Sequence, residues 1–220
     1  MCSSDLSAEA YGECVRLGDQ WGSPFKWPSL YYGWANALHR LGRHKEELQA
    51  SRKALIIWPD EPIFLRYVAA AYLDMPKDKK AEETLEQMAA AATGDDWPVP
   101  RLLYNYGRAY EHADRFDTAE GYYQQAIAAD TTYPWFYYGL GDMLIDHNID
   151  PRRGVELARR ALELSPDNSS ILDTYGWGLY KLGRYAEALK ILEQSWALAV
   201  ESGYDARLRL KAARKAVAEQ

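Results

Sequence analysis

Small and large apolar residues recur along the chain at intervals of 34 to 38 residues. The large residues lie three positions after the small ones, so both sets follow the same steps. The small residues are Ala35, Ala69, Gly107, Gly141 and Gly176, and the large residues are Leu38, Tyr72, Tyr110, Leu144 and Leu179. Because residues three or four positions apart lie on one face of a helix, the pattern predicts a repeated amphipathic helix.

We call each set of residues that recurs with these steps a column. A third column predicts a second helix in each unit and consists of Ala54, Met88, Ala126, Ala161 and Ser195. The segments between the two helices contain Gly or Asp, which support tight turns, as in Leu41–His44, Ala113–Phe116 and Leu182–Tyr185. The steps of the columns predict a one-residue insertion between Gly141 and Gly154. Four additional residues within 89–98 are expected to lengthen the second helix of that unit and to add a loop.

The segment DTYGWGLYKLGRYAEAL, from Asp173 to Leu189, resembles the tetratricopeptide (TPR) repeat almost residue for residue, and residues 100–133 are similar to it. The resemblance covers most of the chain. It implies an all-α fold, a right-handed α-solenoid of stacked antiparallel helix pairs. We divide residues 28–202 into five repeats, 28–61, 62–99, 100–133, 134–168 and 169–202. The style of the repeat is similar to that of many bacterial proteins.

The two ends of the chain are predicted to differ from the repeats, as terminal units of a solenoid do. Residues 1–27 form an N-terminal segment in which Ser7–Leu17 is predicted to be an orphan second helix. Residues 203–220 form a capping helix with Leu208, Ala212 and Val217 facing inward. Met1–Leu6 reads MCSSDL, which resembles a translated sequencing adapter. If these six residues are artefactual, the N-terminus is truncated.

Composition narrows the class of protein and of partner. The chain has 220 residues, 48% hydrophobic and 26% charged, which is typical of a folded protein. A net charge of -6 argues against nucleic-acid binding, which requires clustered basic residues. The sequence has no apolar run long enough to span a membrane, and the N-terminus as given lacks the charged-then-apolar layout of a signal peptide. The localisation therefore stays unknown: cytoplasmic as the sequence stands, periplasmic or envelope-associated if the N-terminus is truncated.

The sequence shows no pattern of catalytic or metal-binding residues. The histidines His39, His44, His112 and His147 have no His or Cys partner at a typical metal-ligand spacing, so no metal site and no cofactor are predicted. Gly139-Leu140-Gly141 and Gly176-Trp177-Gly178 do not complete a phosphate-binding motif, and we interpret these glycines as helix-packing residues. We therefore predict that the chain is not an enzyme.

The resemblance to TPR proteins implies that the first helices line a concave groove that binds a protein or peptide partner. Helical spacing places nine candidate residues there: Tyr32, Asn36, Arg66, Arg101, Tyr104, Asn105, Arg108, Tyr138 and Trp177. Arginine and asparagine donors suit a carboxylate or peptide carbonyls, and the aromatic rings suit anchor contacts. We expect an extended peptide or partner helix with an acidic feature near Arg66–Arg108.

Other interpretations stay open. The aromatic residues could pack between repeats, and the arginines could pair with neighbours such as Glu111. The carboxylate clamp of some TPR proteins is matched by Arg66 and Asn105 but not by Ala70, so we do not expect chaperone-tail binding. The aromatic surface could also mediate self-association. At the level of the whole protein, the chain could be an assembly factor or a lipoprotein-associated component of the bacterial cell envelope, or the regulatory part of a longer enzyme or transcription factor.

Overall fold

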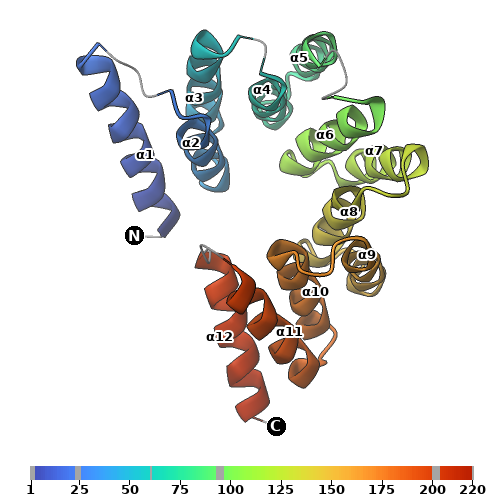
Figure 1. Cartoon of the computed structure of the whole chain (residues 1–220). Helices are drawn as coiled ribbons and strands as arrows, with labels where there is room; N and C mark the ends of the chain where they lie inside the picture. Colours follow the sequence, from blue (N-terminus) through green and yellow to red (C-terminus); the bar gives the residue numbers. More distant parts are fainter. Residues whose placement is uncertain (1–2, 23–25, 60, 93–96, 200–203, 220) are drawn as a thin grey trace. The chain divides into compact units, whose positions relative to one another are not determined.

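In the computed structural model, all regular secondary structure within the described residues is α-helical. The structure describes residues 3–22, 26–59, 61–92, 97–199 and 204–219. Figure 1 shows the twelve helices of these ranges in chain order. They are α1 (Ser3–Gln20), α2 (Pro28–Arg40), α3 (His44–Ile57), α4 (Pro62–Asp74), α5 (Asp78–Ala91), α6 (Val99–His112), α7 (Phe116–Ala129), α8 (Pro134–Asp146), α9 (Pro151–Leu164), α10 (Ser169–Lys181), α11 (Tyr185–Leu198) and α12 (Tyr204–Ala218).

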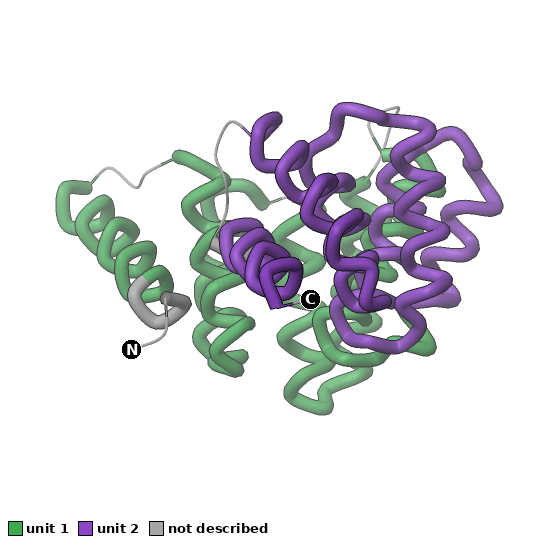
Figure 2. Tube along the Cα trace, turned by 90° about the horizontal axis from the view of Figure 1, so that it is seen from below, with its two compact units in different colours: residues 1–119 green, residues 120–220 purple. Residues whose placement is uncertain are grey.

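The chain divides into two compact units, residues 1–119 and 120–220, with the boundary inside α7 (Figure 2). In the first unit, consecutive helices from α1 to α5 pack against one another, and α4 also contacts α2 and α6. In the second unit, consecutive helices from α8 to α12 pack in the same way, and α8 contacts α10. Within each unit, the first helices of successive pairs therefore form a layer of their own.

The predicted columns form the core of the helix pairs. All members of the small column and of the column from Ala54 to Ser195 are buried, and the large column is buried except for the half-buried Tyr110. The small residues allow the helices to approach closely. A Cβ atom added to Gly154 of α9 would lie 2.6 Å from Ile145 Cγ1 and 2.9 Å from the carbonyl oxygen of Gly141 in α8. These contacts confirm the all-α repeat fold that the pattern predicts.

The turns inside the helix pairs share one hydrogen-bonded geometry. Gly42 follows α2 with a φ of 67°, and the N–H of Arg43 donates to the carbonyl of Leu38 at 3.0 Å, which caps the end of the helix. The same bond recurs from Lys77 to Tyr72, from Arg115 to Tyr110 and from Arg184 to Leu179. Glycine or Asp114 provides the left-handed backbone at three of these turns, as the sequence predicts.

The two predicted insertions have different outcomes. The turn between α8 and α9 spans residues 147–150 and is one residue longer than the turns at 41–43, 113–115 and 182–184, which confirms the insertion in the fourth pair. The expected lengthening of α5 is wrong, because this helix has 14 residues, as do α3, α7, α9 and α11. The added residues follow the helix, and residues 93–96 lie outside the described part of the chain.

The C-terminal helix packs through a different face from the predicted one. Leu210 and Ala213 of α12 are buried against Leu192 of α11, whereas Leu208 is 45% exposed. Both faces of this helix contain apolar residues, so its sequence pattern alone did not define the orientation. The observed orientation directs Arg209 toward acidic residues of α8 and α10. Among the described helices, none is both long and apolar enough to cross a membrane.

We predict that Gly154→Ala destabilises the chain by about 1–3 kcal/mol, because the new methyl group overlaps Ile145 and the backbone of Gly141. Gly121→Ala in α7 is the matched control, since a Cβ atom there meets nothing within 4 Å. This control should be neutral or stabilise the chain by up to about 1 kcal/mol through helix propensity. Thermal unfolding followed by circular dichroism measures both changes, and equal shifts would contradict the steric argument.

Candidate functional site

The nine predicted groove residues lie on first helices, but they belong to two units that are described separately. Seven lie on α2, α4 and α6 of the first unit, and Tyr138 and Trp177 lie on α8 and α10 of the second. Asn36 is exposed, Asn105 is buried and the other seven are half-buried. Spacing along the first helices therefore identified mostly accessible residues, and the contacts below show which of them lie together.

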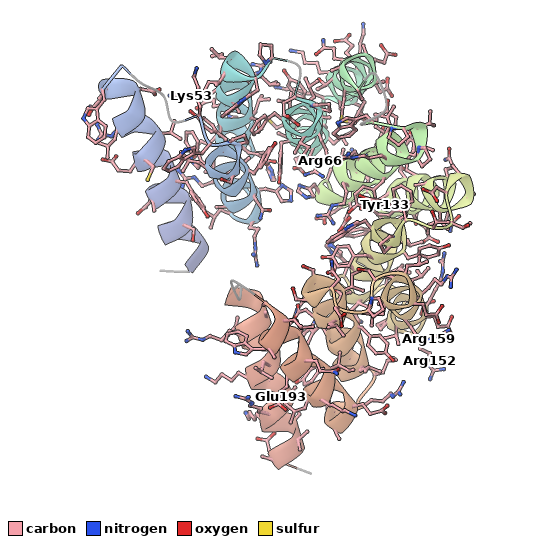
Figure 3. The ribbon with its side chains drawn as sticks, viewed as in Figure 1. Lys53, Arg66, Tyr133, Arg152, Arg159 and Glu193 are labelled. Carbon is pink, nitrogen blue, oxygen red and sulfur yellow. The ribbon has the colours of Figure 1, made fainter. Side chains whose placement is uncertain are left out.

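Arg66 and Asn105 are brought together from α4 and α6. Arg66, labelled in Figure 3, donates from Nη1 to Asn105 Oδ1 at 3.3 Å, and Asn105 Nδ2 donates to the carbonyl of Arg101 at 2.8 Å. The Arg66 guanidinium lies over the Tyr67 ring, 4.9 Å from its centroid. Its Nε is buried and has no hydrogen-bond partner. Arg66 Nε could therefore donate a hydrogen bond to an oxygen atom of a ligand without breaking an existing hydrogen bond.

Aromatic rings of α2 and α4 lie beside this arginine. The Tyr32 ring lies 4.5 Å from the Phe64 ring and 6.4 Å from the Tyr67 ring, measured between centroids. Burial and the negative charge of Glu61 raise the pKa of Tyr32 to about 12, so its phenol is neutral at physiological pH and can donate a hydrogen bond. Phe64 and Tyr67 are buried, so the half-buried Tyr32 is the ring of this cluster that reaches the surface.

The other two predicted arginines have contacts within the chain. The Arg101 guanidinium lies 4.6 Å from the centroid of the Trp97 ring. Arg108 forms an ion pair with Glu111, with 3.1 Å between Nη1 and Oε2. The pairing with Glu111 that the sequence left open is confirmed for Arg108. The positive charge of this surface is thus partly neutralised, and Arg66 is the arginine with an unused buried donor among those described here.

The aromatic surface of the second unit carries a side chain from α12. The rings of Trp177 and Tyr180 are stacked with centroids 4.7 Å apart, and those of Trp135 and Tyr138 meet edge to face at 5.1 Å. The guanidinium of Arg209 lies over Trp177, 5.5 Å from its centroid. A ligand that stacks on Trp177 would therefore meet or displace Arg209.

Arg209 also neutralises a group of carboxylates. It donates from Nη2 to both oxygens of Asp146, at 2.7 and 2.8 Å, and from Nη1 to Asp173. Asp142 lies near Asp146 and accepts a hydrogen bond from Thr174 at 2.6 Å. Burial has the largest effect on the pKa of Asp146, followed by the negative charge of Asp142, and both raise it. Arg209 lowers this pKa, but the net result is a pKa of about 6. Arg209 thus holds α12 to α8 and α10 through charge.

A second polar cluster was not found by the sequence analysis. His39 at the end of α2, His44 and Glu47 at the start of α3, and Asp74 at the end of α4 each offer one donor atom, and these atoms lie within 4.8 Å of one another. The signal in the sequence is the spacing of His39, His44 and Glu47 across the turn at Gly42. Asp74 lies 27 residues after Glu47, and only the packing of α4 on α3 brings it there.

Comparisons with known proteins agree with the helical repeat. A family model described as tetratricopeptide repeat matches residues 100–143. The chain is 27% identical over 152 residues to BBSome complex member BBS4 of Bos taurus, covering 69% of this chain and 28% of that protein. It is also 27% identical over 161 residues to a TPR repeat-containing protein of Pseudomonas aeruginosa, covering 73% of this chain and 27% of that protein.

The chain spans about a quarter of the length of these curated relatives. Among solved structures, a tetratricopeptide repeat protein from Parabacteroides merdae matches with a TM-score of 0.59 at 13% identity. That match covers 96% of this chain and 78% of the other. At this identity the likeness shows the fold alone.

We predict a pH-dependent contribution from Asp146. The pKa of this carboxyl group rises from 3.8 to about 6 on folding. The protonated group therefore stabilises the fold fully below pH 3.8, and this stabilisation is lost as the pH rises through about 6. Asp146→Asn removes this pH dependence of stability. The melting temperature of the parent minus that of the variant should therefore decrease as the pH is raised from about 4 to about 7. The Asp146 side chain is 37% exposed, so solvent screening limits the change to the order of a few °C.

Thermal unfolding of both chains across this pH range measures the difference. Glu86→Gln, on an exposed position of α5, gives the background effect of removing one negative charge. A parent-minus-variant difference for Asp146→Asn that stays constant from pH 4 to pH 7 would contradict the raised pKa.

Proposed function

Because the chain is a tetratricopeptide-repeat protein, we propose that it is a non-catalytic scaffold whose first unit binds an extended peptide along α2, α4 and α6. TPR folds are protein-interaction scaffolds, and this family assignment supports a protein partner. The observation that carries the finer proposal is the buried Nε of Arg66, which has no hydrogen-bond partner. A buried donor without an acceptor is unfavourable by about 1–3 kcal/mol, so a ligand that supplies the acceptor gains affinity.

The chemistry of the ligand follows from the surroundings of Arg66. Asn105 and Tyr67 hold the guanidinium from two sides, which lowers the entropy that its side chain loses on binding. A guanidinium edge binds a carboxylate in a bidentate way and a peptide carbonyl through a single bond. We therefore propose that the peptide places an acidic side chain, or failing that a main-chain carbonyl, against Arg66 Nε.

Neighbouring residues of the first unit would provide the remaining contacts. Tyr32 and Tyr104 offer rigid rings with one polar atom each, which is typical of interface anchors. Asn36 is exposed on α2 and can pair with a peptide main chain. Together with Arg66, these residues belong to the proposed repeats 28–61, 62–99 and 100–133. We assign less of the binding to Tyr138 and Trp177, because Arg209 lies over Trp177.

Membership of a larger assembly is the second candidate function. The relative from Bos taurus is named as a member of the BBSome complex, and it is about 27% identical to this chain. A scaffold of this kind could act as an assembly factor, in the cell envelope or elsewhere, or as the regulatory part of a longer protein. Both roles use a bound protein segment, so the same binding surface would serve them.

We predict that Arg66→Gln weakens the binding of selected peptides at least about tenfold, because a hydrogen bond to a charged group contributes about 1.5–3 kcal/mol. Peptides are first selected from a random library on the full chain, and dissociation constants are then measured by fluorescence anisotropy. Arg115→Gln makes the same chemical change at an exposed arginine that pairs with Asp78, and it should leave affinity unchanged. Circular dichroism verifies the fold of both variants.

The sequence of the selected peptides distinguishes the binding modes. Preferences at alternate positions, together with an acidic residue, would support an extended peptide, whereas preferences spaced by three or four would indicate a partner helix. An empty selection, or equal losses in Arg66→Gln and Arg115→Gln, would contradict binding at this surface.

A further inference from the structure

The four-residue cluster of His39, His44, Glu47 and Asp74 has the spacing of metal ligands. His39 Nδ1 lies 3.3 Å from Glu47 Oε2 and 3.6 Å from Asp74 Oδ2. His44 Nδ1 lies 3.3 Å from Glu47 Oε2 and 3.0 Å from Asp74 Oδ2. Tetrahedral zinc with bonds of about 2.1 Å to nitrogen and oxygen separates its ligand atoms by about 3.4 Å. The four nitrogen-to-oxygen separations are therefore already close to those that one ion would impose, and all four donor atoms lie within 4.8 Å of one another.

The carboxylates of the cluster are buried more deeply than ordinary surface acids. The Glu47 side chain is fully buried, and the Asp74 side chain is 12% exposed. Glu47 Oε1 and Asp74 Oδ2 form no hydrogen bond, although His44 Nδ1 lies 3.0 Å from the latter. Buried carboxylates without full hydrogen bonding are costly unless a positive charge compensates them. One divalent cation would neutralise both.

The histidine rings are held in place by their neighbours. The His39 ring is stacked on that of His112 in α6, with centroids 4.6 Å apart and planes 26° from parallel. The His39 and His44 rings meet edge to face at 5.7 Å. Contacts that fix the orientation of an imidazole are typical of the surroundings of metal ligands, because they reduce the entropy lost on binding.

From this arrangement we propose that His39, His44, Glu47 and Asp74 form a binding site for a divalent transition-metal ion, with zinc as the best fit. Two nitrogen and two carboxylate ligands at tetrahedral separations suit zinc, whereas magnesium and calcium prefer all-oxygen sites with six or more ligands. The site joins the end of α2, the start of α3 and the end of α4. A bound ion would therefore fasten the first helix pair to the second.

Protons are the competing occupants of the site. Burial alone would lower the pKa of His39, but the hydrogen bond and charge of Glu47, with Asp74 and Asp114, outweigh it and raise the pKa. A protonated His39 could thus compensate carboxylate charge in this cluster without a metal. The two alternatives predict different effects of zinc. Carboxylates compensated by a protonated His39 gain no stability from zinc, whereas a metal site gains stability in proportion to the logarithm of the zinc concentration.

The test is metal binding by the full chain, free of any histidine tag and stripped with a chelator. Isothermal titration with zinc chloride at neutral pH should give one ion per chain, and the melting temperature should rise with zinc. Cobalt chloride should give the intense visible absorption of tetrahedral Co²⁺. No heat of binding and no rise in melting temperature in the parent would overturn the proposal.

Variants assign the ion to these residues. His44→Ala removes a half-buried ligand, and Glu47→Gln keeps the volume of a buried one, so each should weaken zinc binding at least about tenfold. His147→Ala removes a histidine that follows α8, outside the cluster, and should bind zinc like the parent. Equal binding by His44→Ala, Glu47→Gln and the parent would show an adventitious ion and overturn the proposal.

A measurement on the parent alone guards against variants that fail to fold. Zinc should shift the NMR signals of the imidazoles of His39 and His44 in proportion to occupancy and leave those of His147 unchanged. A shift confined to His147, or spread evenly over all four histidines, would contradict the site. The result is independent of peptide binding, because the cluster shares no residue with the contacts proposed for Arg66.

Discussion

The close approach of the two helices within each pair is the constraint on which the other features depend. Small residues are buried at one position of every first helix from α2 to α10. In the pair of α8 and α9 the backbones approach so closely that a Cβ atom on Gly141 or on Gly154 would lie 3.0 or 2.9 Å from the carbonyl oxygen of the other glycine. Because interiors pack at the density of crystals, this contact fixes the orientation of each first helix within its unit. The residues on its opposite face are then held at the surface.

The first unit holds buried polar groups that the fold itself does not satisfy. Arg66 Nε and Glu47 Oε1 are both buried without a hydrogen-bond partner, and both belong to the first unit. Natural proteins satisfy almost all buried polar groups, so the exceptions point to functional sites. One of these groups is a donor beside aromatic rings, which suits a peptide, and the other is an acceptor beside two histidines, which suits a cation.

The sequence predicted what depends on period and turn chemistry. Each repeat obeys the same local rules of spacing and turn chemistry. These rules predicted the buried columns that end at Gly176 and Ser195, the turn at Asp114 and the insertion after Gly141. The face of α12 could not be predicted in this way, because Arg209 pairs with acids far away in sequence. The same holds for Asp74, which joins the histidines through the packing of α4 on α3, and for the contact of Arg66 with Asn105.

The most direct test of the account is a crystal structure of the full chain bound to a library-selected peptide. The account predicts a peptide that lies along α2, α4 and α6 of the first unit, with one of its oxygen atoms within hydrogen-bond distance of Arg66 Nε. A peptide bound on the second helices α3 and α5, or on the second unit, with Arg66 Nε still lacking a partner, would contradict it.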